Sequence, residues 1–324
     1  MTASDGLRFH GQVAVITGAG GGLGKHYALL LASRGARVVV NDIGGSVTGD
    51  GADAEAAEAA AQEIRDLGGE AVADTNTVAR PEGGEAIIDT ALDSWGRVDI
   101  VINNAGIVRD APFEDITADR LEPLLDVHLR GAFHVTRPAW KIMRQKGYGR
   151  ILNTCSAAGL LGAADMSNYG AAKTGLIGMT RVLAAEGAAH GIKVNAIAPI
   201  AYTRMLAHSV AGAGLQDDEG AQAVLDDLVN QYLRRLDPAL VAPVAAFLTH
   251  RDCPVSGEIY TVGAGQVARF FIGRTKGFYS PALTIEDVRD HLAEIRDEAG
   301  YTVPAGPADE MAELFAAIMA DGTG

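Results

Sequence analysis

The stretch Thr17-Gly18-Ala19-Gly20-Gly21-Gly22-Leu23-Gly24 decides the predicted fold of this 324-residue chain. It follows a β-branched run, residues 12–17, that is typical of a buried parallel strand, and it leads into an apolar segment with helical spacing, residues 23–33. Its glycines let the backbone turn tightly and let a diphosphate approach the amide groups at the helix N-terminus. An isolated glycine-rich turn is weak evidence, so the prediction depends on the segments that follow.

The second predicted strand, residues 36–41, ends on an acidic residue, Asp42. An acidic side chain roughly 20 residues past a glycine-rich turn is where a dinucleotide-binding fold accepts hydrogen bonds from the adenine ribose hydroxyls. The same carboxylate would repel a 2′-phosphate, so Asp42 favours NAD over NADP. The alternative is that Asp42 only caps a turn before Gly44-Gly45.

Strand and helix patterns alternate along the rest of the chain. This alternating order of strands and helices predicts an α/β fold with a Rossmann-type, doubly wound parallel sheet of about seven strands and helices on both faces. The further strands are expected at 70–73, 97–102, 150–154, 192–198 and 258–262, and the further helices at 50–67, 82–95, 117–145, 167–190 and 238–248.

Residues 200–236 interrupt this alternation after the sixth strand, and a helix is expected there at 221–233. A long connecting segment beyond the carboxyl end of a strand indicates a substrate lid, although a surface insertion would give the same sequence pattern. We therefore predict an NAD-binding domain over 1–265 and a helical C-terminal extension over 266–324. Basic and aromatic residues at the start of this extension either pack against protein or contact an anionic nucleotide such as coenzyme A.

Charge and composition exclude several classes of function. Lys and Arg total 27 against 41 Asp and Glu, a formal net charge of −14, so a nucleic-acid or anionic-membrane surface is not expected. No apolar run reaches the about 20 residues that a membrane-spanning helix needs. Cys155 and Cys253 lie far apart without metal-ligand spacing, and residues 1–6 lack a basic and apolar leader. A reduced cytoplasmic protein without a metal site is therefore predicted.

Tyr169 and Lys173 lie four residues apart in a predicted helix, so their side chains share one face. A neighbouring ammonium would lower the pKa of the phenol, which is about 10 in an unperturbed tyrosine, and would make it a usable acid and base. Taken alone, a half-buried tyrosine beside a solvated lysine is the simpler explanation. The glycine-rich turn and Ser156, at the carboxyl end of the strand at 150–154, favour the catalytic interpretation.

Together these motifs resemble those of the short-chain dehydrogenase/reductase family. The matching pieces are the glycine-rich turn, Asn103-Asn104-Ala105-Gly106, Ser156, Tyr169 to Lys173 and Asn195 to Pro199, in the order of the family. Further segments, including 40–45, 127–133 and 262–265, resemble the (3R)-hydroxyacyl-CoA dehydrogenase domain of peroxisomal multifunctional enzymes, which is also known as a 17β-hydroxysteroid dehydrogenase type.

This resemblance implies a role for each motif residue. Hydride would move between the nicotinamide and a substrate carbon, while Tyr169 passes the hydroxyl proton. Ser156 would polarise the substrate oxygen, and Lys173 would hold the nicotinamide ribose and keep the pKa of Tyr169 low. His128 replaces an asparagine that completes a proton relay in many members. We expect it to support the site, although a lone helical histidine is as often structural.

The cofactor contacts expected from the resemblance lie at the ends of several strands. The residue after the third strand that would touch adenine is either Asn76 or Asp74. The expected contacts are Gly18, Gly20, Gly22, Leu23, Gly24, Asp42, Asn76, Asn104, Ala105, Gly106, Tyr169, Lys173 and Pro199.

The predicted function is an NAD-dependent oxidoreductase that interconverts a secondary alcohol and a ketone, with a (3R)-hydroxyacyl-CoA as the expected substrate. The alternatives are a 17β-hydroxysteroid dehydrogenase, an NADPH-dependent 3-ketoacyl reductase and a catalytically silent dinucleotide sensor. Asp42 argues against NADPH, and the retained Ser156, Tyr169 and Lys173 argue against the sensor. A homodimer or homotetramer is expected, because the helices at 117–145 and 167–190 have more apolar positions than one sheet face can cover.

Overall fold

The computed structural model describes residues 6–211 and 235–321 of the chain. Contacts between residues divide the chain into two units, Met1–Arg269 and Phe270–Gly324. The predicted helix at 221–233, and with it most of the predicted lid, lies outside the described residues.

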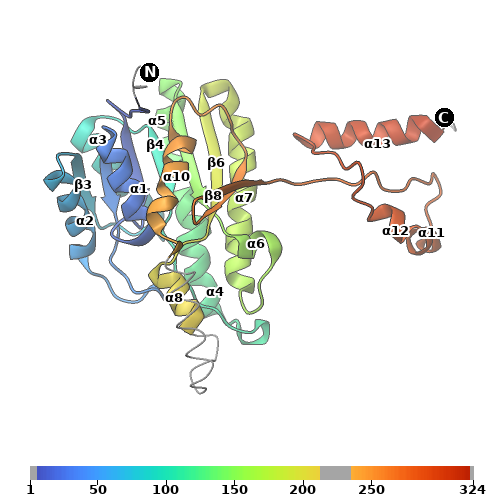
Figure 1. Cartoon of the computed structure of the whole chain (residues 1–324), viewed down its shortest axis with the longest axis horizontal. Coiled ribbons are helices and arrows are strands. Elements are labelled where there is room, and N and C mark those ends of the chain that lie inside the picture. The colour runs from blue at the N-terminus through green and yellow to red at the C-terminus, as the bar shows by residue number, and fades with distance from the viewer. Residues whose placement is uncertain (1–5, 212–234, 322–324) are drawn as a thin grey trace. The chain divides into compact units, whose positions relative to one another are not determined.

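A single sheet forms the centre of the first unit (Figure 1). The pairs from β3 through to β7 are all parallel, and the order of the strands reverses between β1 and β4. In spatial order the strands are β3 (Glu70–Asp74), β2 (Arg37–Asn41), β1 (Val13–Thr17), β4 (Ile100–Asn103), β5 (Gly149–Thr154), β6 (Ile192–Pro199), β7 (Ile259–Gly263) and β8 (Gln266–Phe270). The predicted doubly wound parallel sheet is confirmed.

Helices cover both faces of the sheet because alternate side chains of its strands point to opposite sides and are buried on both. Ala14 and Ile16 of β1 join a core with α1 (Gly22–Ser33), α2 (Ala54–Asp66) and α10 (Ala242–Thr249). Val13 and Val15 join the opposite core, which is formed with α3 (Pro81–Trp95), α5 (Gly131–Lys146) and α7 (Ser167–Gly187). Shorter helices are α6 (Ala157–Leu161), α8 (Arg204–Ala211), η1 (Phe113–Asp115), η3 (Ala188–His190) and η5 (Pro238–Leu240).

The long helix predicted over 117–145 is present but is not regular throughout. It runs from α4 (Ala118–Leu125) through a π-helical turn, η2 (Asp126–Arg130), into α5. The irregular turn therefore precedes Pro138, which lies inside α5. Such turns insert one residue into a helix and redirect the side chains around it, and here the turn carries His128.

An eighth strand extends the sheet beyond the about seven that the sequence predicts. Ala264 and Gly265 connect β7 to β8 with φ values of +49° and +81°. Two residues with positive φ form the turn that suits a tight hairpin, so β8 runs antiparallel to β7.

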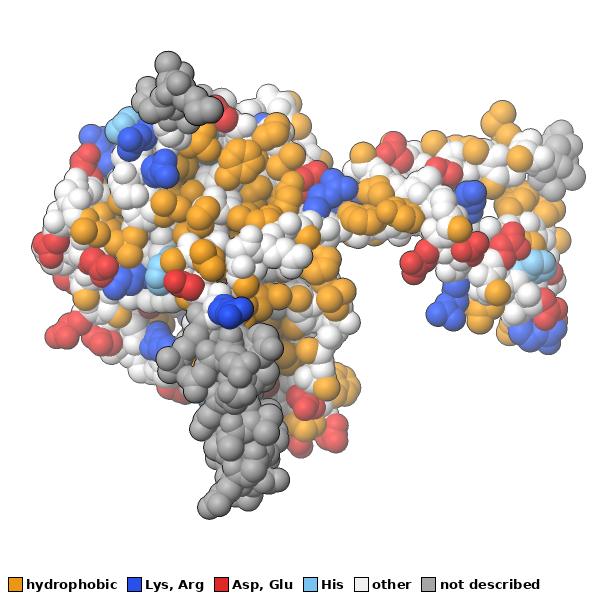
Figure 2. Space-filling view, in the orientation of Figure 1, with side chains coloured by type: hydrophobic (Ala, Val, Ile, Leu, Met, Phe, Trp, Pro, Cys, Tyr) orange, Lys and Arg blue, Asp and Glu red, His pale blue; other side chains and the backbone are white. Residues whose placement is uncertain are grey.

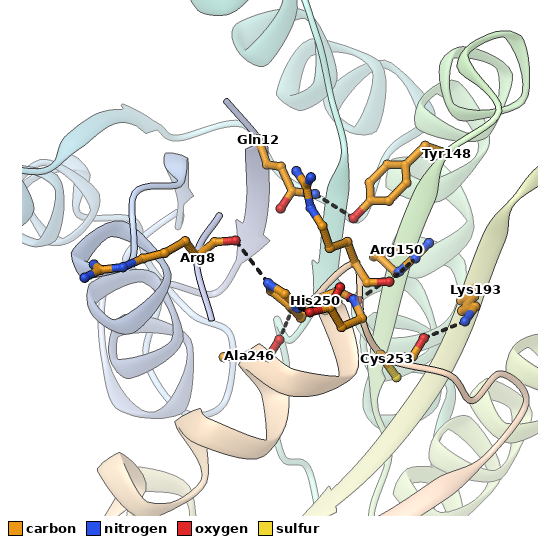
Figure 3. Close-up of polar contacts among 11 residues, drawn as sticks. Arg8, Gln12, Tyr148, Arg150, Lys193, Ala246, His250 and Cys253 are labelled. Carbon is orange, nitrogen blue, oxygen red and sulfur yellow. Dashed lines mark hydrogen bonds and ion pairs between the residues drawn. The ribbon is translucent and has the colours of Figure 1, made fainter. Parts of the chain in front are cut away.

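A buried polar network closes the amino ends of the central strands (Figure 3). Arg150 of β5 is 5% exposed, and its guanidinium donates to the carbonyl oxygens of His250, Gly191 and Arg251 at 3.0 to 3.2 Å. Two of these acceptors directly follow α10, so Arg150 satisfies carbonyl groups at the end of that helix. This end of the sheet is structural, and the predicted site residues lie at the other end.

The second unit holds α11 (Ile285–Asp290), α12 (Leu292–Ile295) and α13 (Pro307–Asp321), so helices are present in the predicted C-terminal extension. Arg274 forms an ion pair with Glu310 at 2.8 Å, and Phe271 stacks on Tyr301. None of its described residues is fully buried, and Figure 2 shows apolar side chains on its surface. Within residues 6–211 and 235–321, no helix is both long and apolar enough to cross a membrane.

Candidate active site

A cavity of about 430 Å³ lies at the carboxyl ends of the strands in the first unit. Its walls come from the glycine-rich turn after β1, the residues after β2 and β4, the end of β5, the start of α7 and the segment after β6. This is where the strand order reverses, the position at which open α/β sheets bind ligands.

The glycine-rich turn packs tightly on the loop after β4. Gly18 has a φ of +63°, and a Cβ there would lie 2.8 Å from Cα of Ala105. A Cβ at Gly24 would lie 2.3 Å from the carbonyl oxygen of Gly18. The amide of Asn104 donates to the carbonyl oxygens of Thr17 and Gly18, both at 3.0 Å. Gly18, Gly24 and Asn104 therefore fix the shape of the turn.

The N-terminus of α1 opens into this cavity without a side-chain partner. Its N-cap, Gly21, provides no capping hydrogen bond, and the first turn of the helix contains no acidic residue. The first amide groups of a helix need acceptors, and the helix dipole favours an anion there. The local structure therefore fits the diphosphate of a dinucleotide.

Asp42 lies on the cavity wall after β2, and the backbone fixes its orientation. Its Oδ2 accepts a hydrogen bond from the amide of Gly20 at 2.9 Å, and its Oδ1 accepts one from the amide of Gly44 at 2.8 Å. Each carboxylate oxygen can still accept a further bond. The two interpretations of Asp42 are thus compatible, since the side chain holds a turn and also faces the cavity.

The structure distinguishes Asp74 from Asn76 at the end of β3. Asp74 is buried and accepts hydrogen bonds from the side chains of Asn41, Asn76 and Thr90 at 2.7 to 2.8 Å. Asn76 lines the cavity, and Asp74 does not. Asp74 therefore acts as the support that holds Asn76 in place.

Ser156, Tyr169 and Lys173 line the same end of the cavity. Ser156 is the N-cap of α6 and accepts a hydrogen bond from the amide of Ala158 at 3.2 Å. Tyr169 and Lys173 are 8% and 3% exposed on α7. The ammonium of Lys173 donates to the carbonyl oxygen of Thr154 at 2.7 Å and lies 5.4 Å from the ring centroid of Tyr169.

Burial governs the acidity of both α7 groups. It raises the pKa of Tyr169 to about 12, against a hydrogen bond with Ser156 that lowers it. Burial also lowers the pKa of Lys173 to about 8. The expectation of a low pKa for Tyr169 is not met in this structure, because loss of solvent around the phenol outweighs the hydrogen bond with Ser156.

His128 lies behind Tyr169 rather than on the wall of the main cavity. It is 3% exposed, and its ring meets that of Tyr169 edge to face with centroids 5.3 Å apart. Nε2 of His128 lies 3.0 Å from the amide nitrogen and 2.8 Å from the carbonyl oxygen of Ile107. It accepts from the amide in one tautomer and donates to the carbonyl oxygen in the other. Nδ1 has no hydrogen-bond partner among the described residues. Burial, then the charge of Lys173, lower the pKa of His128 well below 6.5, so the ring is neutral.

Most of the predicted cofactor contacts meet in the cavity. Gly18, Gly22, Leu23, Asp42, Asn76, Asn104, Ala105, Gly106, Tyr169, Lys173 and Pro199 line it, while Gly20 and Gly24 support the turn from outside. Sequence reasoning missed the cavity residues Ser46, Val47 and Gly49, since they carry no recognisable motif, whereas the cavity residues at 203–206 lie within the predicted lid.

Comparisons with known proteins agree with this geometry. The model of the family described as "short chain dehydrogenase" matches residues 12–214. The chain is 40% identical over 312 residues to peroxisomal multifunctional enzyme A of Dictyostelium discoideum, covering 96% of this chain and 66% of that protein. It is 43% identical over 293 residues to the putative short-chain type dehydrogenase/reductase Rv0148 of Mycobacterium tuberculosis. This match covers 90% of this chain and 96% of that protein.

Among solved structures, full-length peroxisomal multifunctional enzyme type 2 of Drosophila melanogaster matches with a TM-score of 0.75 and 33% identity. This match covers 96% of the chain and 50% of the Drosophila protein, so the chain spans only part of that multifunctional relative. The family model covers more than half of the chain, and the mycobacterial relative covers most of it. The chain therefore belongs to the short chain dehydrogenase family, whose members are oxidoreductases that use a nicotinamide dinucleotide.

Proposed function

We propose that this chain is an NAD-dependent dehydrogenase that interconverts a (3R)-3-hydroxyacyl-CoA and the corresponding 3-ketoacyl-CoA. The observation that carries the proposal is the convergence of Ser156, Tyr169 and Lys173 on one cavity that also presents the carboxylate of Asp42. The acyl-CoA substrate is supported by the motif resemblance to (3R)-hydroxyacyl-CoA dehydrogenase domains and by the similarity to peroxisomal multifunctional enzymes.

The residues present fit a bound dinucleotide along the length of the cavity. The uncapped amides of α1 would hold its diphosphate, Asp42 the adenine ribose hydroxyls and Asn76 the adenine edge. Lys173 would donate to the nicotinamide ribose. Asp42 supports NAD over NADP, because its charge repels a 2′-phosphate. When bound, the nicotinamide accepts or returns the hydride.

Proton transfer is assigned to Tyr169. In oxidation the substrate C–H bond breaks with its electron pair, and the hydroxyl proton passes to the phenolate of Tyr169. In reduction the neutral phenol gives its proton to the forming alkoxide, and the hydroxyl of Ser156 donates to the same oxygen. Because burial raises the pKa of Tyr169 to about 12, the proton-donating form predominates at neutral pH. Oxidation should therefore accelerate as the pH rises.

His128 is proposed to position Tyr169. Its neutral, buried ring fixes one edge of the phenol ring by the edge-to-face contact, and its hydrogen bond with the backbone of Ile107 fixes the imidazole in turn. Burial lowers the pKa of His128, which favours the neutral ring, so we assign it no proton transfer. This assigns a supporting function to the histidine that replaces the expected asparagine.

A homodimer or homotetramer is proposed from the apolar surface of the long helices. Phe133 of α5 and Val182 of α7 are 50% and 56% exposed in the single chain. Pairing of such helices about a two-fold axis would bury these side chains.

The cellular location proposed from the sequence is the cytoplasm. The Dictyostelium and Drosophila relatives carry the word peroxisomal in their names, and the mycobacterial relative does not. A fluorescent fusion in the source cells would decide between the two locations, since diffuse and punctate signals are easily told apart.

Initial rates with matched substrates test the proposal. The purified chain should oxidise (3R)-3-hydroxyacyl-CoA esters with NAD much faster than with NADP, and faster than the (3S) esters or a 17β-hydroxysteroid. A preference for the steroid would change the proposed substrate but would still support a dehydrogenase. An absence of turnover with either cofactor across a panel of secondary alcohols would support the dinucleotide sensor instead.

A further inference from the structure

The cavity wall contains three charged residues among those the structure describes: Asp42, Lys173 and Arg204. Lys173 lies at the end with Tyr169 and Ser156. Arg204 is the first residue of α8, which follows the end of β6. Its Nη2 lies 3.9 Å from the position that a Cβ on Gly21 would occupy, so the guanidinium lies over the glycine-rich turn.

Arg204 has no hydrogen-bond or ion-pair partner among residues 6–211 and 235–321. The basic residue within the first turn of α1, Lys25, differs in this respect, because it forms an ion pair with Glu63 at 2.5 Å. The amides at the start of α1 also lack a side-chain acceptor. An unpaired guanidinium and an uncapped helix N-terminus therefore face the same space from two elements.

We infer that Arg204 binds the diphosphate of the dinucleotide together with the N-terminal amides of α1. A guanidinium presents two parallel N–H groups that match phosphate oxygens, and a bidentate contact of this kind is stronger than a neutral hydrogen bond. In a chain with a net charge of −14, a local cation strengthens the binding of a dianionic group. The inference rests on the proposed dinucleotide-dependent function.

Coenzyme A also contains a diphosphate, so the same chemistry has two sources. The position of Arg204 favours the cofactor, because Gly21 belongs to the turn that a dinucleotide diphosphate approaches, whereas the reacting groups lie at Ser156 and Tyr169. Met205 and Leu206 follow Arg204 and line the same cavity. Arg204 is therefore continuous in sequence with part of the apolar wall.

Charge removal at this position tests the inference. Arg204→Gln should weaken NADH binding about tenfold, and its NADH dissociation constant should depend less on salt than that of the wild type. Arg204→Lys keeps the charge and should recover part of the affinity. Arg144→Gln removes an exposed arginine of α5 that does not line the cavity, so it should bind NADH like the wild type. NADH fluorescence titration at two salt concentrations measures all four proteins.

A second comparison separates the two diphosphates. At saturating NADH, Arg204→Gln should change the KM for 3-ketoacyl-CoA and for the matching pantetheine thioester by the same factor. Wild-type affinity of Arg204→Gln for NADH would overturn the inference while leaving the dehydrogenase assignment intact. A loss confined to the CoA ester would overturn it in favour of substrate binding. Failure of the wild type to bind NADH or NADPH would instead contradict the proposed function itself.

Discussion

Replacement of Lys173 by methionine is expected to change how the stability of the chain depends on pH. The side chain of Lys173 is 3% exposed and donates one hydrogen bond, to the carbonyl oxygen of Thr154. Burial lowers its pKa from 10.5 to about 8. The folded chain therefore binds this proton more weakly than the unfolded chain does, and folding is favoured as the proton leaves.

The size of the effect follows from the two pKa values. The stabilising contribution of Lys173 is fully present above pH 10.5 and is lost as the pH falls through 8. At about 1.4 kcal/mol for each pKa unit, the pKa difference corresponds to about 3 kcal/mol over the whole window. Between pH 7 and pH 9.5, roughly 2 kcal/mol of this contribution should appear in the free energy of unfolding.

Urea unfolding at these two pH values measures the effect. The free energy of unfolding of the wild type minus that of Lys173→Met should rise by about 2 kcal/mol from the lower to the higher pH, at equal protein concentration. Lys141→Met, on the exposed side of α5, is the matched control and should follow the wild type. A difference between wild type and Lys173→Met that stays constant with pH would refute the reasoning.

Three further outcomes are expected. Asp42→Ala should raise the KM for NAD about tenfold, because the adenine ribose hydroxyls lose a charged acceptor, and it should improve the use of NADP relative to NAD. If the ratio of kcat/KM for NAD to that for NADP is unchanged, Asp42 does not bind the ribose. His128→Leu should lower kcat about tenfold with little change in the KM for NAD, and His128→Asn should recover part of the rate. Equal activity of the wild type and both variants would show that His128 does not position Tyr169. Light scattering should give a dimer or tetramer, and a stable monomer at micromolar concentration argues against pairing through α5 and α7.

The parts of the fold that the sequence predicts are those specified by local chemistry. The β-branched run of β1 is buried on both faces, and the glycines after it leave the backbone few alternatives, so the strand, the turn and α1 follow from short-range patterns. The turn before β8 is different. Ala264 adopts a positive φ, which its residue type does not indicate, so the sequence contains no clear signal for the eighth strand.

The features that the sequence could not predict depend on contacts between distant segments. Asp74 and Asn76 are told apart by hydrogen bonds from Asn41 and Thr90, which come from other elements. The acidity of Tyr169 depends on burial by the whole site, which a spacing of four residues does not reveal. Arg204 falls in the predicted lid, but the sequence does not show that β6 brings it over the glycine-rich turn.

The most direct test of the account compares hydride transfer by the wild type and by Tyr169→Phe. With NAD and a (3R)-3-hydroxyacyl-CoA, the wild type should form NADH, and the variant should bind NADH with unchanged affinity. The kcat of the variant should fall by about 10²- to 10⁴-fold, because only the phenolic proton carrier is removed. Wild-type turnover by Tyr169→Phe would contradict the assignment of the proton transfer, and with it the central claim about this site.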